Sequence, residues 1–212
     1  MPQVTEKNLK VQHLTEGITK IHIFRDYLSQ LQGRFLDVGC GTGEVMKYVC
    51  SSLEVIGIDV SNDYLRKAVN RGEKAIWADL TRPLPFETES FDAALCSDVL
   101  EHLINPFATL CEIHRILKTD GLLFAHVPNE FGHKSLMQIF RGNGICNHSF
   151  FPDAEEWNYP HIRFFSHKGF KSMLQKGGFA IKDDLTNFGR GWRRFFYPLF
   201  GSGPSFVAKK IK

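Results

Sequence analysis

The sequence predicts an α/β protein built on a mostly parallel, doubly wound sheet of about seven strands. Three observations carry this prediction. Short apolar runs alternate with helical patterns, a glycine-rich loop follows the first run at once, and an aspartate ends both the second and the third run. Continuously apolar runs suit parallel strands buried on both faces, and right-handed crossovers place helices on both sides of such a sheet.

The expected elements follow one another with short connections. Residues 1–32 hold an N-terminal helix, because Leu14, Ile18, Ile21 and Phe24 recur at helical spacing and Gly33 ends the run. Strands are expected at Arg34–Val38, Glu54–Asp59, Ala75–Asp79, Phe91–Cys96, Leu122–Val127, Phe179–Lys182 and Phe206–Lys210. The last two strands would have a long connection if they pair as a hairpin.

Helices are expected between most of these strands, and capping residues mark their ends. They lie, in order, at Val45–Val49, from Ser61 to Gly72, from Asn105 through Pro106 to Lys118, near Ser135–Phe140, and from Ser166 to Gly177. Thr119–Gly121 is expected to form a turn before the fifth strand.

Composition indicates one globular domain over residues 1–212, with 43% hydrophobic and 23% charged residues. A net charge of +3 is too small to favour a nucleic-acid partner. No stretch is apolar enough to span a bilayer, and the N-terminus has no signal-peptide core. Five scattered cysteines without a C-x-x-C pair argue against disulfides and against a metal site, and favour a cytoplasmic location.

Regular patterning fails over residues 129–166, where aromatic side chains are frequent. A long irregular stretch inside a compact domain is usually functional. We therefore expect a lid-like insertion after the fifth strand that recognises the substrate. A second candidate contact, near the C-terminus, is a basic and aromatic cluster at Arg190, Trp192, Arg193 and Arg194; a solvated charge cluster is the alternative.

The glycine-rich loop after the first strand reads Leu36–Gly43. Glycines in this place let the backbone approach a ligand closely. The loop departs from the dinucleotide pattern G-x-G-x-x-G because position 44 is Glu. Asp37 precedes the first glycine by two residues, and a carboxylate there suits a ligand that carries an ammonium and a sulfonium better than a pyrophosphate.

Two further aspartates follow strands on the same expected edge of the sheet. Asp59 ends the second strand, where a carboxylate can accept both hydroxyls of a ribose. Asp79 ends the third strand, close to where an adenine would lie. Each alone is commonly a cap or loop residue, but the three together on one edge indicate a nucleoside-binding site.

After the fourth strand the chain reads Ser97–His102, and here it resembles the class I S-adenosylmethionine (SAM)-dependent methyltransferases with an Asp-Val-Leu-Glu-His signature. The resemblance covers about Gly33–Leu185 and implies a Rossmann-like sheet with strand order 3-2-1-4-5-7-6. It also implies SAM as cofactor, with S-adenosylhomocysteine as product. The cofactor-binding residues that it implies are Asp37, Gly39, Cys40, Gly41, Asp59, Val60, Asp79, Leu80 and Ser97.

Val127–His133, Arg141-Gly142 and Pro160–Ser166 are similar both to the methionine biosynthesis protein W family and to methyltransferases encoded with bacterial polysaccharide and lipid modification enzymes. The first family lacks the histidine signature, which favours the second group. The expected acceptor is therefore a small molecule or a glycan/lipid-type molecule, methylated at oxygen, while the oligomeric state stays open.

His102 is the first candidate for a catalytic base, with an orienting hydrogen bond as the alternative, and His161 is the second candidate. Glu101 is expected to be a helix-start residue. An NAD-linked oxidoreductase would share the fold, but Asp37 and Glu44 count against it. Base methylation of nucleic acid is disfavoured because Asn/Asp-Pro-Pro is absent after the fourth strand. The remaining alternative is a SAM-binding regulatory partner of a biosynthetic enzyme, without turnover of its own.

Overall fold

The computed structural model describes residues 23–49, 53–145, 151, 154–155, 158–188, 191–197 and 199–212. Seven strands form one sheet in the order β3-β2-β1-β4-β5-β7-β6. They are β1 (Gly33–Val38), β2 (Leu53–Asp59), β3 (Ala75–Trp77), β4 (Phe91–Ser97), β5 (Leu117–His126), β6 (Phe179–Asp184) and β7 (Ser205–Lys210). The pairs from β3 to β5 are parallel, and β7 runs antiparallel to both β5 and β6. The expected strand order and the terminal hairpin are confirmed.

The helices are α2 (Asn62–Asn70), α3 (Pro106–Ile116), α4 (His133–Phe140) and α5 (His167–Lys176), and residues 23–28 are also helical. The capping predictions hold locally. Ser61 accepts a hydrogen bond from the Tyr64 amide, and Asn105 accepts one from Ala108, with proline at the start of α3. Most of the predicted N-terminal helix lies outside the described residues.

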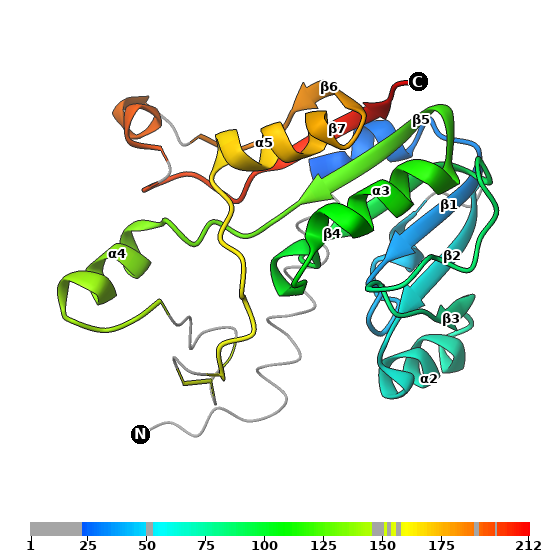
Figure 1. Cartoon of the computed structure of the whole chain (residues 1–212), viewed down its shortest axis with the longest axis horizontal. Coiled ribbons are helices and arrows are strands. Elements are labelled where there is room, and N and C mark those ends of the chain that lie inside the picture. The colour runs from blue at the N-terminus through cyan, green and yellow to red at the C-terminus, as the bar shows by residue number, and fades with distance from the viewer. Residues whose placement is uncertain are drawn as a thin grey trace.

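The two faces of the sheet carry separate apolar cores. On one face, α3 and α5 contribute Leu110, Ile113, Phe170 and Leu174, and Figure 1 shows both helices in front of the sheet. On the other face, Phe24 and Leu28 of the helical residues 23–28 pack with strand residues, among them Phe35, Phe124 and Val207. The parallel strands are therefore buried on both sides, which explains their continuously apolar sequences.

The predicted end of the helix that begins at Asn105 was wrong. Helix α3 stops at Ile116 because Leu117 is extended, fully buried and paired with Phe91. The predicted turn at Thr119–Gly121 lies inside β5, at a register shift opposite Phe91 and Ala93, where Asp120 has a φ of 65°. The three-residue excess on this strand thus forms a bulge.

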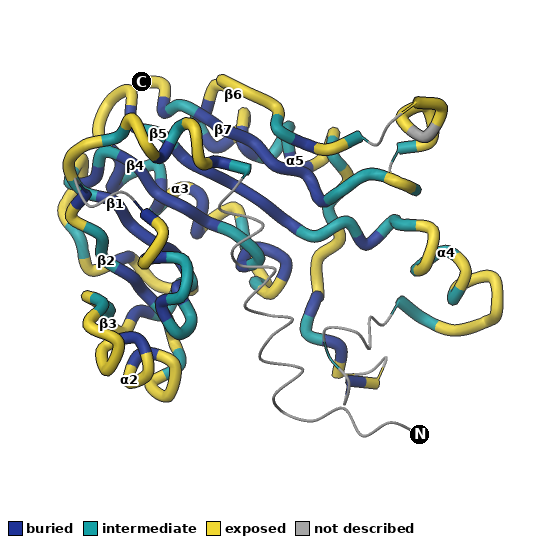
Figure 2. Tube along the Cα trace, turned by 180° about the vertical axis from the view of Figure 1, so that it is seen from behind, coloured by how far each residue is buried: buried dark blue, intermediate teal, exposed yellow. Residues whose placement is uncertain are grey.

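Two other predicted elements are shorter than expected. The helix at Val45–Val49 is a single 3₁₀ turn, η1 (Met46–Tyr48), and β3 ends at Trp77, two residues before Asp79. In the predicted insertion, α4 has no buried residue and extends past the carboxyl ends of β4 and β5, as Figures 1 and 2 show. The carboxyl edge of the sheet therefore lies next to the exposed helix α4.

Candidate functional site

The glycine-rich loop folds over the carboxyl ends of β1 and β2. Gly39, Gly41 and Gly43 have φ values of 73°, 53° and 74°, which glycine adopts without strain. A Cβ on Gly39 would lie 2.4 Å from Cγ2 of Val99, so the loop and the segment after β4 approach closely. A Cβ on Gly41 would meet nothing within 4 Å, which leaves this side of the loop open to a ligand.

Asp37 lies at the end of β1 with only 4% of its surface exposed. Its Oδ2 atom accepts no hydrogen bond from the described residues. Burial, and secondarily the charge of Asp59, raise the pKa of the Asp37 carboxyl to about 7. A buried carboxylate without a partner is costly, and a bound cationic group would remove that cost.

Asp59 ends β2, and backbone amides hold both of its carboxylate oxygens. Oδ2 accepts from the Gly41 amide at 2.9 Å, and Oδ1 accepts from the Ser61 amide at 2.8 Å. The carboxylate is therefore fixed in one orientation and keeps further lone pairs for a ligand. Next to it, Val60 exposes 61% of its surface, and its carbonyl accepts a hydrogen bond from the indole of Trp77 at 3.0 Å.

Asp79 lies in the turn that follows β3. Oδ1 accepts hydrogen bonds from the Thr81 amide and hydroxyl, at 2.9 and 2.7 Å. These bonds, with Arg82 nearby, lower the pKa of the Asp79 carboxyl. The carboxylate is therefore ionised at neutral pH and can accept a hydrogen bond from an exocyclic amine. The adjacent Leu80 carbonyl accepts from the Thr109 hydroxyl at 2.9 Å, which ties this turn to α3.

The structure places Cys40 differently from the other predicted binding residues. Its thiol packs against Gly57 and Met46, inside a small apolar cluster with Leu65. Its amide already donates to the Ile58 carbonyl at 2.9 Å. Burial raises the pKa of this thiol far above its usual value, so it is inert. The buried Cys40 side chain therefore supports the loop from its core side.

Ser97 lies at the end of β4, and its hydroxyl donates a hydrogen bond to the Asp98 carboxylate at 2.7 Å.

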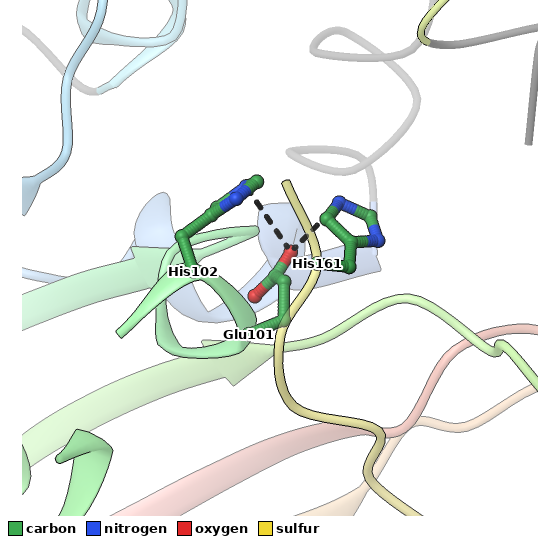
Figure 3. Close-up of side chains that lie close together, drawn as sticks. All are labelled: Glu101, His102 and His161. Carbon is green, nitrogen blue, oxygen red and sulfur yellow. Dashed lines mark ion pairs between the residues drawn. The ribbon is translucent and has the colours of Figure 1, made fainter. Parts of the chain in front are cut away.

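A second group of side chains gathers where the 3₁₀ turn η2 (Leu100–His102) follows β4. The Glu101 carboxylate is buried, and its Oε1 atom lies 4.0 Å from Nε2 of His102 and 4.0 Å from Nε2 of His161 (Figure 3). The two imidazole rings are 4.7 Å apart between centroids. The structure thus brings together the two predicted catalytic histidines, around a carboxylate that was expected only to start a helix.

Backbone hydrogen bonds hold the segment around His161 against η2. The Glu101 carbonyl accepts from the amides of Ile162 and Arg163, at 2.9 and 3.0 Å. The Arg163 guanidinium donates to the Ile104 carbonyl at 2.6 Å. The end of the predicted insertion is therefore docked on the turn after β4.

The hydrogen bonds at Nδ1 determine which ring nitrogen of each histidine is free. His102 Nδ1 lies 3.0 Å from the Pro160 carbonyl, and because a carbonyl only accepts, Nδ1 carries the proton. His161 Nδ1 contacts the buried Glu130 carboxylate, which also accepts from the Tyr159 hydroxyl at 3.1 Å. In the neutral rings, Nε2 is therefore the unprotonated nitrogen, and in both histidines it lies 4.0 Å from Oε1 of Glu101.

Burial lowers the pKa of His102, although its bond to Pro160 opposes this effect. The ring is neutral at physiological pH and can act as a base or a ligand. The sequence reasoning did not identify Glu101 and Glu130 as site residues. Glu101 belongs to the quoted signature and Glu130 to the Val127–His133 motif, so both were within reach of motif-based reasoning.

Comparison with known proteins shows similarity to methyltransferases in sequence and in structure. The methyltransferase domain family matches residues 36–125, which include the glycine loop, Asp59, Asp79 and η2. Residues 36–125 therefore carry a methyltransferase domain. An uncharacterised protein of Methanocaldococcus jannaschii is 29% identical over 196 residues, which cover 84% of this chain and 76% of that protein.

Two further similarities concern named methyltransferases. The ubiquinone biosynthesis O-methyltransferase of Glaesserella parasuis is 31% identical over 147 residues, 64% of this chain and 61% of that protein. The magnesium protoporphyrin IX methyltransferase of Synechocystis, solved with bound S-adenosylhomocysteine, is 17% identical with a TM-score of 0.66, covering 100% of this chain and 90% of that one. Six further curated relatives are matched over 30% to 46% of their lengths.

The residues at the carboxyl edge of the sheet fit SAM, the cofactor that the sequence resemblance implies. The buried Asp37 carboxylate, which lacks a partner among the described residues, suits the ammonium of the methionine part. The open side of Gly41 and the fixed Asp59 carboxylate suit a ligand lying across the loop. In the part of the chain that the structure describes, no helix is long and apolar enough to cross a membrane.

Proposed function

We propose that this methyltransferase transfers the methyl group of SAM to a hydroxyl oxygen of a small molecule or a glycan/lipid-type acceptor. The observation that carries the proposal is the cluster of Glu101, His102 and His161. One nitrogen of each imidazole and one carboxylate oxygen converge within 4.8 Å of one another at the turn after β4, and both Nε2 atoms lie 4.0 Å from Oε1 of Glu101. A hydroxyl acceptor must lose a proton during transfer, and a positioned imidazole or carboxylate is a group that can assist this loss.

The proposed roles at the cofactor are those that the resemblance to class I methyltransferases implies. Asp37 binds the ammonium of SAM, Gly39 and Gly41 bring the backbone to its methionine part, and Asp59 accepts the ribose hydroxyls. Val60 covers the adenine, Asp79 and the Leu80 amide bind its edge, and Ser97 lines the methionine end. Cys40 supports the loop.

Bound SAM supplies a methyl carbon that the sulfonium has already activated. The protein aligns the acceptor oxygen with that carbon and excludes water, and alignment of this kind contributes up to about 7–11 kcal/mol in favourable cases. As the oxygen bonds to the methyl carbon, the carbon–sulfur bond breaks, and its electron pair stays on sulfur. The hydroxyl proton leaves on the side of the cluster that contains His102 and His161.

The exposed aromatic residues near the carboxyl edge support an acceptor with an apolar part. Trp192, Phe195 and Phe196, in the 3₁₀ segment η4 (Gly191–Phe196), expose 61%, 74% and 51% of their surfaces. Trp192 packs against Phe200, which also contacts His133 at the start of α4. We propose that residues 129–166 form a substrate-recognition insertion within a single domain, and that this protein acts in the cytoplasm, where its free thiols Cys40, Cys96 and Cys111 are stable.

Two experiments test this function. Calorimetric titration with SAM is expected to give micromolar binding by the wild type and loss of roughly 100-fold in affinity in Asp59→Ala, because two charge-assisted hydrogen bonds to the ribose disappear. Asp63→Ala, which removes an exposed carboxylate on α2, is the matched control.

The second experiment uses SAM with an isotopically labelled methyl group and a panel of phenols, lipids and phosphorylated sugars. The chemical shift of the transferred methyl group distinguishes oxygen, nitrogen and carbon products. An O-methyl signal supports the proposal, and a signal only from N-methyl or C-methyl products refutes it. SAM binding without turnover on any acceptor would favour a regulatory partner instead.

A further inference from the structure

We propose that Glu101, His102 and His161 together bind one divalent transition-metal ion, and that this ion receives the hydroxyl oxygen of the acceptor. The second half of this inference rests on the proposed function, whereas metal binding itself does not. Among the residues that the structure describes, this is the group whose His and carboxylate ligand atoms lie within 4.8 Å of one another. The proposal departs from the sequence-based prediction that the chain has no metal site.

The orientation of both imidazoles is the first argument. Each ring directs its Nδ1 to an oxygen acceptor, the Pro160 carbonyl for His102 and the Glu130 carboxylate for His161. Each therefore leaves Nε2 unprotonated in the neutral ring, and both Nε2 atoms lie 4.0 Å from the same Glu101 oxygen. Histidines that bind metals have this arrangement, because the bond at the other nitrogen fixes the tautomer and makes the ligand more basic.

The unprotonated Nε2 atoms of both histidines and the Glu101 oxygen all carry lone pairs. They repel one another unless a cation or protons lie between them. The separations of 4.0 Å are too long for direct hydrogen bonds. Metal–ligand distances of about 2.0–2.2 Å place neighbouring ligand atoms roughly 3.0–3.4 Å apart. The rings therefore need to approach the carboxylate by only about 1 Å on binding, and His102, with 36% of its side chain exposed, has room for this movement.

The surroundings favour a site that is closed on one side and open on the other. His161 and Glu101 are buried, and the ring of Phe151 packs against both His161 and Tyr159. His102 borders the solvent. Three protein ligands leave coordination positions vacant, and these would be reached from the side of His102.

The donor set indicates the kind of ion. Two imidazole nitrogens and one carboxylate suit Mn²⁺, Fe²⁺, Co²⁺ or Zn²⁺, whereas Mg²⁺ and Ca²⁺ prefer oxygen ligands. Such an ion lowers the pKa of a bound hydroxyl group. The hydroxyl proton then passes to water, and the oxygen bonds to the methyl carbon of SAM while the carbon–sulfur bond breaks. In this role His102 and His161 hold the ion and do not take the proton.

The test uses the full chain, stripped of metal with EDTA, and Co²⁺ as the probe, because its visible absorption reports nitrogen and oxygen coordination. We expect one Co²⁺ to bind saturably in the absence of SAM and acceptor. Glu101→Gln and His161→Ala are each expected to weaken binding at least ~100-fold, and Glu130→Gln roughly 10–100-fold through loss of the bond to His161. His133→Ala, which removes an exposed histidine of α4, is the matched control and is expected to bind Co²⁺ as the wild type does.

SAM titration of each variant shows that it is folded, so loss of Co²⁺ binding is not mistaken for unfolding. Absence of saturable Co²⁺ binding by wild type that still binds SAM would overturn the inference. Equal weakening in His133→Ala and Glu101→Gln would do the same, because the metal would then bind adventitious surface histidines.

Methyl transfer separates this inference from the proposed function. Loss of O-methylation in EDTA, with recovery on adding Mn²⁺ or Zn²⁺, supports both. O-methylation that persists in EDTA retains the proposed function and overturns the metal site. Co²⁺ binding at Glu101 without any O-methylated product supports the metal site and refutes the proposed function.

Discussion

Nε2 of His161 lies 4.0 Å from Oε1 of Glu101, a contact that joins the end of the irregular segment to the turn after β4. It depends on the bonds that the Glu101 carbonyl accepts from Ile162 and Arg163, so the backbone of Glu101 positions the ring that its side chain faces. The acceptor site is thus assembled by docking one segment on another, whereas the cofactor site is built along a single edge of the sheet.

Because the two sites are separate, a substitution in the acceptor site should slow methyl transfer without weakening the binding of SAM. We expect His161→Ala to lower kcat for methyl transfer by about 10²–10⁴-fold, the usual contribution of a positioned proton-transfer group or metal ligand. The dissociation constant for SAM should stay within about twofold. Asp63→Ala, which removes an exposed carboxylate on α2, should retain both values, and a large loss of SAM affinity in His161→Ala would show that the two sites are not separate.

Binding of SAM should depend on pH through Asp37. The pKa of this carboxyl is about 7 without ligand, so below pH 7 it is mostly protonated and cannot pair with an ammonium. Affinity for SAM is expected to rise with pH up to about 7, by up to tenfold per pH unit, and then to level off. Calorimetry in buffers of different ionisation enthalpy should detect proton release on binding below pH 7. A flat profile from pH 5 to 7 would contradict this role.

The same carboxyl should destabilise the ligand-free protein. The folded state keeps the Asp37 proton up to about pH 7, while the unfolded chain loses it near the ordinary value of 3.8. The free energy of unfolding therefore falls as pH rises between these values. We expect Asp37→Asn to raise Tm at pH 7.5 by at least ~3 °C, since 1 kcal/mol moves Tm by about 2–4 °C in a domain of this size. The variant should also lose SAM binding, and a lower Tm would contradict the prediction.

Gly39 should tolerate no side chain. Its φ of 73° strains any other residue, and a Cβ would lie 2.4 Å from Val99. Gly39→Ala is expected to lower SAM affinity at least ~10-fold, because backbone strain of about 1–3 kcal/mol and displacement of Val99 distort the loop. Gly72→Ala has a comparable φ of 89° but open space around its Cβ, so it should leave the SAM dissociation constant unchanged. Equal effects of the two substitutions would show that the contact with Val99 is unimportant.

Trp192 should contribute to acceptor binding and not to cofactor binding. Covering an exposed aromatic ring with an apolar acceptor is worth about 1.5–3 kcal/mol. Trp192→Ala is therefore expected to raise KM for a lipid-type acceptor by roughly tenfold or more, with the SAM dissociation constant unchanged. Phe107→Ala, on α3, removes another exposed aromatic ring and should leave KM as in the wild type. An unchanged KM in Trp192→Ala would place the acceptor elsewhere.

The sequence by itself determined the order and type of most elements, because apolar periodicity, glycines and capping residues act locally. Ser61 and Asn105 cap their helices as predicted, and Asp37 and Asp59 end neighbouring strands at one edge of the sheet. Parallel strands bring their carboxyl ends together, so residues at strand ends become neighbours without further information. At Leu117 the local helical pattern conflicted with burial of the side chain in the core. Burial prevailed, and helix α3 ended at Ile116.

Only the tertiary structure decided which side chains meet across the irregular segment. Periodicity does not reveal that His161 docks on Glu101, that Glu130 fixes the ring of His161, or that the Cys40 thiol points into the core. These contacts join residues far apart in the chain, through hydrogen bonds made by a segment with no repeating pattern. The cofactor could therefore be predicted from sequence, while the geometry of the acceptor site depended on how the folded segments pack.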